Sequence, residues 1–68
     1  MKTIDACGLS CPEPVLLMRQ GLEAGEFPFV VLVDDDTPRE NILRYANNHG
    51  HATSVEDKDG IFHITFTS

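Results

Sequence analysis

The sequence contains few basic residues, and this shortage limits what the protein can bind directly. Five Lys and Arg stand against eleven Asp and Glu among its 68 residues, which gives a formal net charge of -6. Nucleic-acid phosphates are held by clustered Lys and Arg side chains, and five basic residues give little basis for such a cluster. We therefore expect no direct nucleic-acid binding, and any RNA contact would need a partner protein.

The sequence also lacks long apolar segments and a leader. No apolar run is long enough to span a bilayer, and the chain does not open with a charged stretch followed by an apolar one. We expect a cytoplasmic protein that makes no membrane contact. With 41% apolar residues, 68 residues suffice for one small core. We predict a single domain, 1–68, that is either complete or part of a longer protein.

Residues that bind metals are scarce as well. Two cysteines are too few for a disulfide framework, and a closed metal site needs about four convergent ligands. His49, His51 and His63 lie far along the chain from both cysteines. We therefore expect no metal and no cofactor. The spacing also defines no Cys-His or Ser-His-Asp arrangement, so a self-contained hydrolase is not supported.

The pattern of apolar residues predicts the element order βαβαββ. Strands are expected over residues 2–6, 27–33, 51–56 and 61–66, and helices over residues 12–23 and 37–50. A strand-helix-strand crossover makes the first two strands parallel, and Asp59-Gly60 predicts a hairpin turn between the last two. The predicted fold class is α+β, a two-layer α/β sandwich with two helices packed on one face of a four-stranded mixed sheet.

Local patterns refine this prediction. The apolar run 27–33 indicates the central strand, covered on both faces. Thr37-Pro38-Arg39-Glu40 predicts a capping box, with Thr37 as the N-cap and Pro38 at the first helical position. The expected buried positions are Val15, Met18 and Leu22 in the first helix, Ile42, Leu43, Tyr45 and Ala46 in the second, and Phe62, Ile64 and Phe66 in the last strand.

Cys11 is the residue whose sequence context most strongly predicts chemistry. Proline is tolerated in the first turn of a helix, so Pro12 at the first helical position makes Cys11 the N-cap. Pro12 and Pro14 have no N–H, which leaves the amides of Glu13 and Val15 to point toward the cap side chain. Those amides and the helix dipole favour a thiolate, and we predict a lowered pKa of Cys11 and a reactive role. The alternative is an inert buried thiol.

Cys7 lies four residues before Cys11, a spacing that permits a disulfide without requiring one. It is either a resolving thiol, which would attack a sulfur-modified Cys11, or a small core residue. Because parallel strands end at one edge of a sheet, we expect Cys11 to share an edge with Asp34, Asp35 and Asp36. For this acidic run, solvated carboxylates before a helix are favoured over repulsion of a Cys11 thiolate or docking of a basic partner.

Leu16 and Leu17 fall outside the buried stripe of the first helix and stand close in sequence to the reactive cysteine. One interpretation is an apolar patch on which another protein docks. The other is that the rotation of the helix buries one of the two.

One motif spans the turn before the first helix and the helix start, Asp5-Ala6-x-Gly8-Leu9-x-Cys11-Pro12-Glu13-Pro14. It resembles the signature of the TusA/SirA-like family of small sulfur-carrier proteins, and the resemblance covers nearly the whole chain. The resemblance implies a βαβαββ fold similar to the C-terminal domain of a translation initiation factor. It implies that Cys11 carries sulfur as a persulfide, received from a cysteine desulfurase or another sulfur donor protein and passed to a downstream thiol acceptor protein. No cofactor is implied, and the chain would be a sulfurtransferase-type carrier rather than a self-contained enzyme.

Departures from the family pattern bear on the pathway. Ser10 stands where the tRNA-thiolation member has Arg, and Cys7 stands where members more often carry Arg or an aliphatic residue. Residues 39–46 resemble the YedF-type subgroup associated with selenium metabolism, in which this unit forms an N-terminal domain. The open destinations are tRNA thiolation, molybdenum-cofactor biosynthesis, selenium metabolism and sulfur oxidation. The alternative functions are a thiol-disulfide redox switch using Cys7 and Cys11, and a non-catalytic interaction module.

Overall fold

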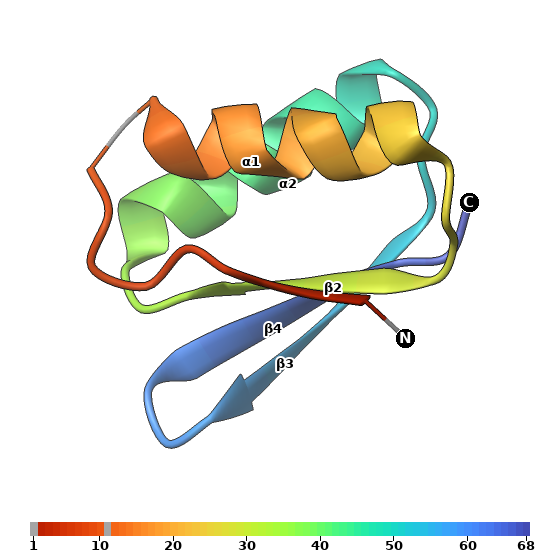
Figure 1. Ribbon diagram of the computed structural model, residues 1–68. Coiled ribbons are helices and arrows are strands. Elements are labelled where there is room, and N and C mark those ends of the chain that lie inside the picture. Colours follow the sequence, from red (N-terminus) through yellow and green to blue (C-terminus); the bar gives the residue numbers. More distant parts are fainter. Residues whose placement is uncertain (1, 11) are drawn as a thin grey trace.

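Two helices and four strands follow one another in the predicted order. The computed structural model describes residues 2–10 and 12–68. Its elements are β1 (Lys2–Asp5), α1 (Glu13–Ala24), β2 (Phe29–Val33), α2 (Asp36–Asn48), β3 (Thr53–Lys58) and β4 (Ile61–Phe66). Both helices cover the same face of a mixed sheet (Figure 1). The predicted α+β sandwich is therefore confirmed.

β2 lies inside the sheet, whose strand order is β1-β2-β4-β3. It pairs in parallel with β1 and antiparallel with β4, and Val31 lies opposite both Ile4 and Ile64. β3 forms the far edge by pairing antiparallel with β4. The predicted interior position of this strand is confirmed.

In the described part of the chain, helices cover only one face of β2, which corrects the prediction of a strand covered on both faces. The residues that face the helices are fully buried, namely Phe29, Val31 and Val33. Val30 and Leu32 point to the opposite face, because side chains alternate along a strand. Val30 is only 9% exposed and Leu32 is half-buried, so the neighbouring strands shield much of their surface.

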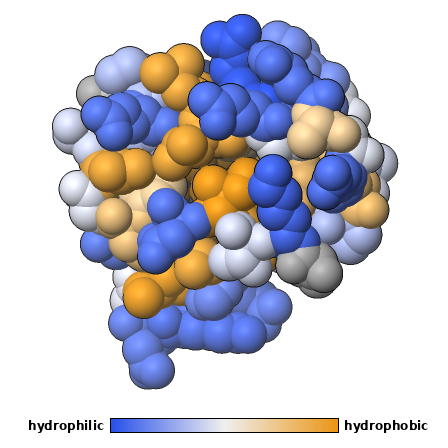
Figure 2. All heavy atoms as spheres, viewed as in Figure 1, coloured by the Kyte–Doolittle hydropathy of each residue, from blue (hydrophilic) through white to orange (hydrophobic). Residues whose placement is uncertain are grey.

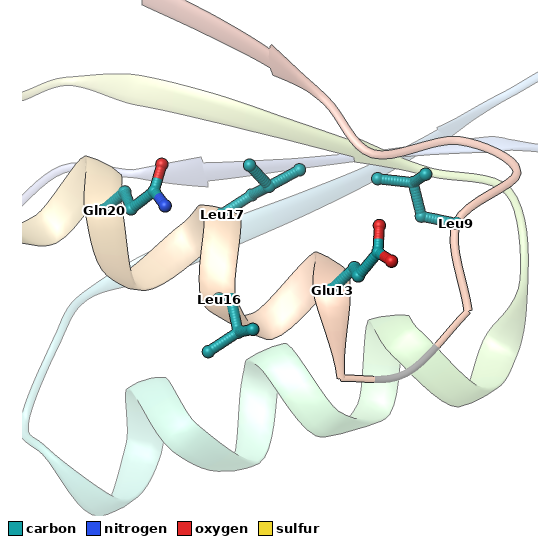
Figure 3. Close-up of a pocket in the computed structure, with 5 residues that line it drawn as sticks. All are labelled: Leu9, Glu13, Leu16, Leu17 and Gln20. Atoms are coloured by element: carbon teal, nitrogen blue, oxygen red, sulfur yellow. The ribbon is translucent and has the colours of Figure 1, made fainter.

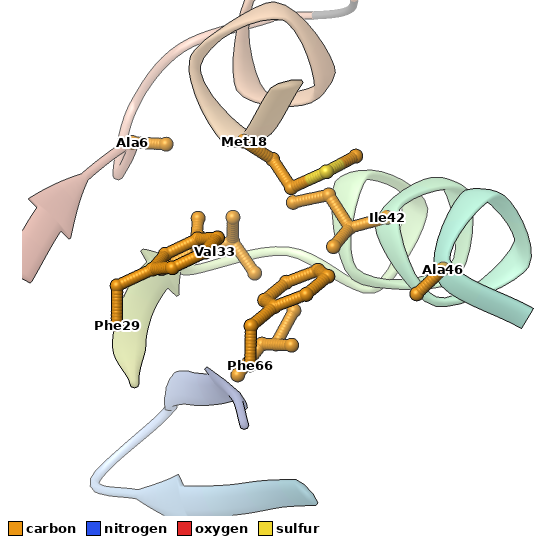
Figure 4. Packing of buried hydrophobic residues seen from close by; sticks show 9 residues of the cluster. Ala6, Met18, Phe29, Val33, Ile42, Ala46 and Phe66 are labelled. Atoms are coloured by element: carbon orange, nitrogen blue, oxygen red, sulfur yellow. The ribbon is translucent and has the colours of Figure 1, made fainter. Parts of the chain in front are cut away.

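The core lies between the helices and the sheet (Figure 4). The rings of Phe29 and Phe66 stack with their centroids 4.9 Å apart and an angle of 2° between their planes. Met18 from α1 and Ile42 and Ala46 from α2 close over the sheet. Of the predicted core positions, Met18, Ile42, Ala46, Ile64 and Phe66 are buried, and Val15, Leu22, Leu43, Tyr45 and Phe62 are half-buried against them.

Gly21 allows α1 to approach the sheet closely. A Cβ atom at this position would lie 2.8 Å from Cε2 of Phe29 and 2.9 Å from Cδ1 of Ile4. Both distances are shorter than non-bonded carbon atoms tolerate, so a larger residue would push α1 away from β1 and β2. The spacing of apolar residues gives no sign of this contact.

The second helix starts earlier than predicted. It begins at Asp36, and Asp35 is its N-cap in an extended conformation with φ -143° and ψ 153°. The predicted capping box at Thr37 is therefore wrong, and Thr37 lies inside the first turn. The Asp35 side chain forms no capping hydrogen bond, but the carboxylates of Asp35 and Asp36 at the helix N-terminus suit the positive end of the helix dipole and favour this earlier start. Pro38 fits this start because the N–H of the third helical residue has no partner inside the helix.

The strand after α2 starts later than predicted, at Thr53 instead of residue 51. The His51 N–H donates a hydrogen bond to the Ala46 carbonyl at 2.9 Å, so it completes the end of the helix instead of joining the sheet. The predicted hairpin turn is present, with φ angles of 54° at Asp59 and 82° at Gly60. Two positive φ angles are typical of a type I′ turn, whose twist suits the two strands that it joins.

Candidate functional site

The carboxyl ends of β1 and β2 lie at one edge of the molecule, and both helices start there (Figure 1). The Ala6 N–H donates to the Leu32 carbonyl at 2.8 Å, which continues the parallel pairing beyond β1. The Gly8 N–H then donates to Oδ1 of Asp34 at 3.1 Å. These bonds place the turn after β1 beside the start of the acidic run. The predicted position of Cys11 at this edge lies outside the described residues.

Cys11 lies outside the described residues, so its lowered pKa and reactivity stay predictions. The prediction that it is the N-cap is wrong, because α1 begins at Glu13 and Pro12 is its N-cap. The residues that follow Cys11 form the start of α1. Pro12 and Glu13 are exposed, Pro14 is fully buried, and Val15 is half-buried against the core. The predicted support of a Cys11 thiolate by these residues also stays a prediction.

The Glu13 amide has a partner that the sequence did not predict. Its N–H donates to the Ser10 carbonyl at 3.0 Å, and the Leu16 N–H donates to the Pro12 carbonyl at 3.0 Å. α1 accordingly begins at Glu13, one residue later than predicted, and Pro12 directly precedes it. The Glu13 amide was expected to be free to bind the cap side chain, but a backbone carbonyl already accepts its hydrogen bond.

Cys7 occupies a tight turn, residues 6–9, which we call the Cys7 turn. A backbone hydrogen bond of 3.4 Å joins its ends, and Gly8 has a φ of 76°, which residues with side chains rarely adopt. The Cys7 N–H donates to Oδ1 of Asp5 at 3.0 Å, and the next amide donates to Asp34. Carboxylates from two separate segments therefore fix the backbone at Cys7.

The surroundings of Cys7 make its thiol a weaker acid. Partial burial is the largest cause, and a hydrogen bond to Asp5 and the negative charges of Asp5 and Asp34 also raise the pKa of the Cys7 thiol. Fewer Cys7 side chains are thiolates at neutral pH as a result, and the thiolate is the nucleophile. Neither carboxylate was predicted to act on Cys7, although an aspartate two residues before a turn amide is a familiar spacing.

A pocket opens beside the first turns of α1 (Figure 3). Its volume is about 350 Å³, and its lining residues are Leu9, Glu13, Leu16, Leu17 and Gln20. Leu16 is 46% exposed and Leu9 is 36% exposed, whereas Leu17 is half-buried and packs against the core. The rotation of α1 thus buries one of the two adjacent leucines more than the other. Figure 2 shows hydrophobic residues exposed among hydrophilic ones on the face that α1 presents.

The three aspartates after β2 have separate structural roles. Asp34 accepts the Gly8 N–H, and Asp35 is the N-cap of α2. Asp36 forms an ion pair with Arg39 at 3.5 Å. All three aspartates are exposed, which agrees with the favoured interpretation of solvated carboxylates at a helix start.

Two of the histidines lie at the other end of α2. Nδ1 of His49 lies 2.9 Å from the Tyr45 carbonyl, and the two rings stack 4.0 Å apart. Nδ1 of His51 lies 3.1 Å from the Ser68 carbonyl. Across residues 2–10 and 12–68, no three His, Cys, Asp or Glu side chains are placed to hold a metal ion. Over the same residues, neither helix is long and apolar enough to cross a membrane.

Comparison with known proteins identifies the family. The family model described as Sulfurtransferase TusA matches residues 2–68. Sulfur carrier proteins TusA from Pseudomonas putida strains F1 and KT2440 are each 37% identical to this chain over 59 residues, covering 82% of it and 72% of their own length. The sequence match therefore includes the Cys-Pro-Glu-Pro motif and extends far beyond it.

A solved structure agrees with this assignment. The crystal structure of a SirA-like protein from Desulfitobacterium hafniense matches with a TM-score of 0.89 and 36% identity, covering 100% of this chain and 97% of that one. The YedF-type resemblance of residues 39–46 stays a prediction. By sequence and by fold, the chain belongs to the TusA/SirA-like family of sulfur carriers.

Proposed function

We propose that the protein receives sulfane sulfur from a donor protein, carries it as a persulfide on Cys11 and relays it to an acceptor protein. The observation that carries this proposal is the family match over residues 2–68, which includes Cys11 and the two prolines after it. The names of the Pseudomonas putida relatives, sulfur carrier proteins, support it. In this role the protein is a sulfurtransferase-type carrier rather than a self-contained enzyme. In this proposal residues 1–68 form one domain, and the relay takes place in the cytoplasm.

Two exchange reactions make up the relay. The Cys11 thiolate attacks the terminal sulfur of a donor persulfide, such as one formed on a cysteine desulfurase, and the donor thiolate leaves. A thiolate of the acceptor protein then attacks the outer sulfur of the Cys11 persulfide, and the Cys11 thiolate leaves with the electron pair. Each step replaces one S–S bond by another, so the relay needs no external oxidant or reductant and no cofactor.

The start of α1 supports the anionic states of this relay. The 12 residues of α1 give a helix dipole equivalent to about half a positive charge at its N-terminus. The Ser10 carbonyl already accepts the Glu13 N–H, and Ser10 brings no positive charge to the position before Cys11. The dipole and the Val15 amide are therefore the main sources of stabilisation for a Cys11 thiolate or persulfide.

We propose that partners dock over the pocket beside α1. Leu9 and Glu13, which line this pocket, stand two residues before and two residues after Cys11 in the sequence, so we expect a partner that reaches Cys11 to contact the pocket. The exposed side chains of Leu9 and Leu16 supply apolar contact, and the Glu13 carboxylate supplies negative charge. A partner surface with an apolar side chain beside a Lys or Arg would complement this arrangement.

The test follows the transferred sulfur by mass spectrometry. Incubation with a cysteine desulfurase and cysteine should add the mass of one sulfur atom to the wild-type protein, and a thiol reductant should remove it. Cys11→Ser should gain no sulfur, whereas the matched variant Cys7→Ser should be loaded as the wild type is. Reductant-labile sulfur on the Cys11→Ser protein would show that another residue is the carrier.

The alternative functions predict different results. A redox switch needs Cys7 to attack as a thiolate, and the raised pKa of Cys7 disfavours that attack at neutral pH. Mild oxidation that joins Cys7 and Cys11 rapidly and reversibly would favour the switch. A non-catalytic interaction module predicts an ordinary pKa for Cys11, which the pH dependence of its alkylation measures.

A further inference from the structure

We propose that Asp5 and Asp34 hold Cys7 as an unreactive thiol, so that sulfur carried on Cys11 leaves to a partner protein instead of being discharged within the chain. The inference rests on the proposed persulfide role of Cys11. Asp5 and Asp34 are positioning residues in this proposal. They affect sulfur transfer only through their effect on Cys7, and they contact neither the donor protein nor the acceptor protein.

The backbone of the Cys7 turn keeps both carboxylates beside the thiol. Oδ1 of Asp5 accepts the N–H of Cys7 itself at 3.0 Å, and Oδ1 of Asp34 accepts the N–H of Gly8 at 3.1 Å. Asp5 is the last residue of β1, and Asp34 directly follows β2. Neither charge can move away from Cys7 without breaking a hydrogen bond that holds the turn.

The Cys7 turn is itself anchored, so Cys7 cannot easily move away from the carboxylates. Ala6 is 1% exposed, and its N–H donates to the Leu32 carbonyl at 2.8 Å. On the other side, Gly8 adopts a φ of 76°, a conformation that suits the turn. Cys7 is half-buried between these two fixed residues.

Negative charge on both segments disfavours a second negative charge on the Cys7 sulfur. Burial, the hydrogen bond to Asp5 and the charges of Asp5 and Asp34 all raise the pKa of this thiol above its ordinary value of 9.0. Among the described residues, these two carboxylates are the charged groups that shift it. A smaller fraction of Cys7 is therefore thiolate at neutral pH than for an ordinary cysteine, and the thiolate is the nucleophile.

A reactive thiol four residues from the Cys11 persulfide would break the persulfide and release its outer sulfur. The Cys7 thiolate would attack the inner sulfur of the persulfide, which is Sγ of Cys11. A Cys7–Cys11 disulfide bond would form, the bond to the outer sulfur would break, and hydrosulfide would leave with the electron pair. The proton of the Cys7 thiol would pass to solvent. The resulting disulfide could accept no further sulfur until a reductant opened it.

A protein with a single thiol tests the effect on Cys7 directly. In the Cys11→Ser background, iodoacetamide alkylates only Cys7, and the pH dependence of the rate reports its thiolate. Asp5→Asn and Asp34→Asn each keep an oxygen that can accept the turn N–H while removing the charge. Each should raise the alkylation rate at neutral pH on the order of two- to fivefold, the size expected for one partly solvated charge pair. The increase should shrink as salt is added, because salt screens the charges.

Asp35→Asn in the same background is the matched control. It removes the same charge from the same acidic run and keeps a residue that caps a helix well. Asp35 is not among the groups that shift Cys7, so the alkylation rate should not change. The proposal is overturned if Asp5→Asn and Asp34→Asn leave the rate unchanged, or if Asp35→Asn raises it equally.

The second measurement uses the chain with both cysteines, loaded with inorganic polysulfide so that no partner protein is needed. The double variant Asp5→Asn/Asp34→Asn should lose its persulfide faster than the wild type, release hydrosulfide and form the internal disulfide. Adding Cys7→Ser to this variant should restore the lifetime of the persulfide. An unchanged lifetime despite a more reactive Cys7 would overturn the protective role. Failure of Cys11 to take up sulfur would instead overturn the proposed function, while the alkylation rates would still show whether the carboxylates control Cys7.

Discussion

The two ends of β2 are held by different kinds of interaction. At its start, Phe29 lies opposite Phe66 in the register of the sheet, and their stacked rings are fully buried. Just past its end, Asp34 holds the Cys7 turn through a hydrogen bond between exposed groups. Apolar packing fixes the first end, whereas the second end depends on charged acceptors. The longest dimension of the molecule is only 26 Å. Within this very small domain, the packing that stabilises the fold and the groups that act on the Cys7 thiol lie at opposite ends of one strand.

This comparison predicts that changes at the two ends have different consequences. A substitution at the Phe29 end should lower the free energy of unfolding and leave thiol reactivity unchanged in the protein that remains folded. A substitution of a carboxylate at the Cys7 turn should change thiol reactivity at a small cost in stability. The following predictions test this division, from the largest expected effect to the smallest.

Phe66→Ala should have the largest effect. Phe66 is fully buried and stacks on Phe29, and removing such a ring leaves a cavity that costs about 3–5 kcal/mol. A domain of this size has a total stability of roughly 5–15 kcal/mol or less, so much of the folded population should be lost. Urea unfolding followed by circular dichroism measures the change. A cost no larger than that of Asp34→Ala would break the comparison.

Gly21→Ala should come next. Alanine favours a helix over glycine by about 1 kcal/mol, but its Cβ would meet Phe29 and Ile4 at 2.8 and 2.9 Å. We expect the overlap to dominate and to lower the free energy of unfolding by about 1–3 kcal/mol. Gln20→Ala is the matched control, because Gln20 is the exposed neighbour on the same helix and should be nearly neutral. A Gly21→Ala protein as stable as the wild type would show that α1 can move without cost.

Asp34→Ala should have a smaller effect on stability and a clear effect on reactivity. It removes the acceptor of the Gly8 N–H, and the loss of one exposed hydrogen bond costs about 0.5–1.5 kcal/mol. Asp34→Asn keeps an acceptor and should cost less, while both variants should make Cys7 easier to alkylate. Chemical unfolding and alkylation of the same samples separate the hydrogen bond from the charge. Unequal alkylation with equal stability would locate the effect in geometry alone.

The smallest expected effect is a pH dependence of stability. The pKa of Cys7 is raised in the folded state above its ordinary value of 9.0, so the folded state binds the thiol proton more tightly than the unfolded chain does. This stabilisation is fully present below the ordinary pKa and is lost as the pH rises through the folded pKa. The wild type should therefore lose stability relative to Cys7→Ser under alkaline conditions, as urea unfolding at a series of pH values can show. A difference that stays constant with pH would contradict this sign.

The order and layers of the fold were predictable because the spacing of apolar residues is a local signal. The exact ends of the helices and strands depend on which of several neighbouring residues caps a helix or joins a strand. The spacing of apolar residues does not decide between them. Asp35 and Thr37 are both good N-cap residues, and the helix starts after the earlier one. The His51 amide could have joined β3, yet the Ala46 carbonyl accepts it at 2.9 Å. The start of α2 and the partner of the His51 amide therefore depend on the three-dimensional arrangement of the chain.

In the candidate site, too, some features were predictable from the sequence and others were not. Parallel pairing of the first two strands was predictable, and it places their carboxyl ends at one edge because this follows from topology. The prediction that Cys11 shares this edge with the acidic run falls outside the described residues. The hydrogen bond between Gly8 and Asp34 joins residues 26 positions apart, so no local motif indicates it. Its effect on Cys7 was likewise unpredicted, since the sequence shows only that an acidic run and a cysteine are both present. The stability variants and the alkylation series address these unpredicted contacts.

Gly21 also has a mechanical consequence for the start of α1. It lies eight residues after Glu13, which is about 12 Å along the helix axis. At Gly21 the backbone of α1 lies close to Phe29 and Ile4, so this part of the helix is held near the sheet. A side chain here would push the middle of α1 outward and would shift Glu13 and the rest of the first turn with it. The absence of one methyl group at Gly21 thus helps to determine where the helix start lies relative to the Cys7 turn.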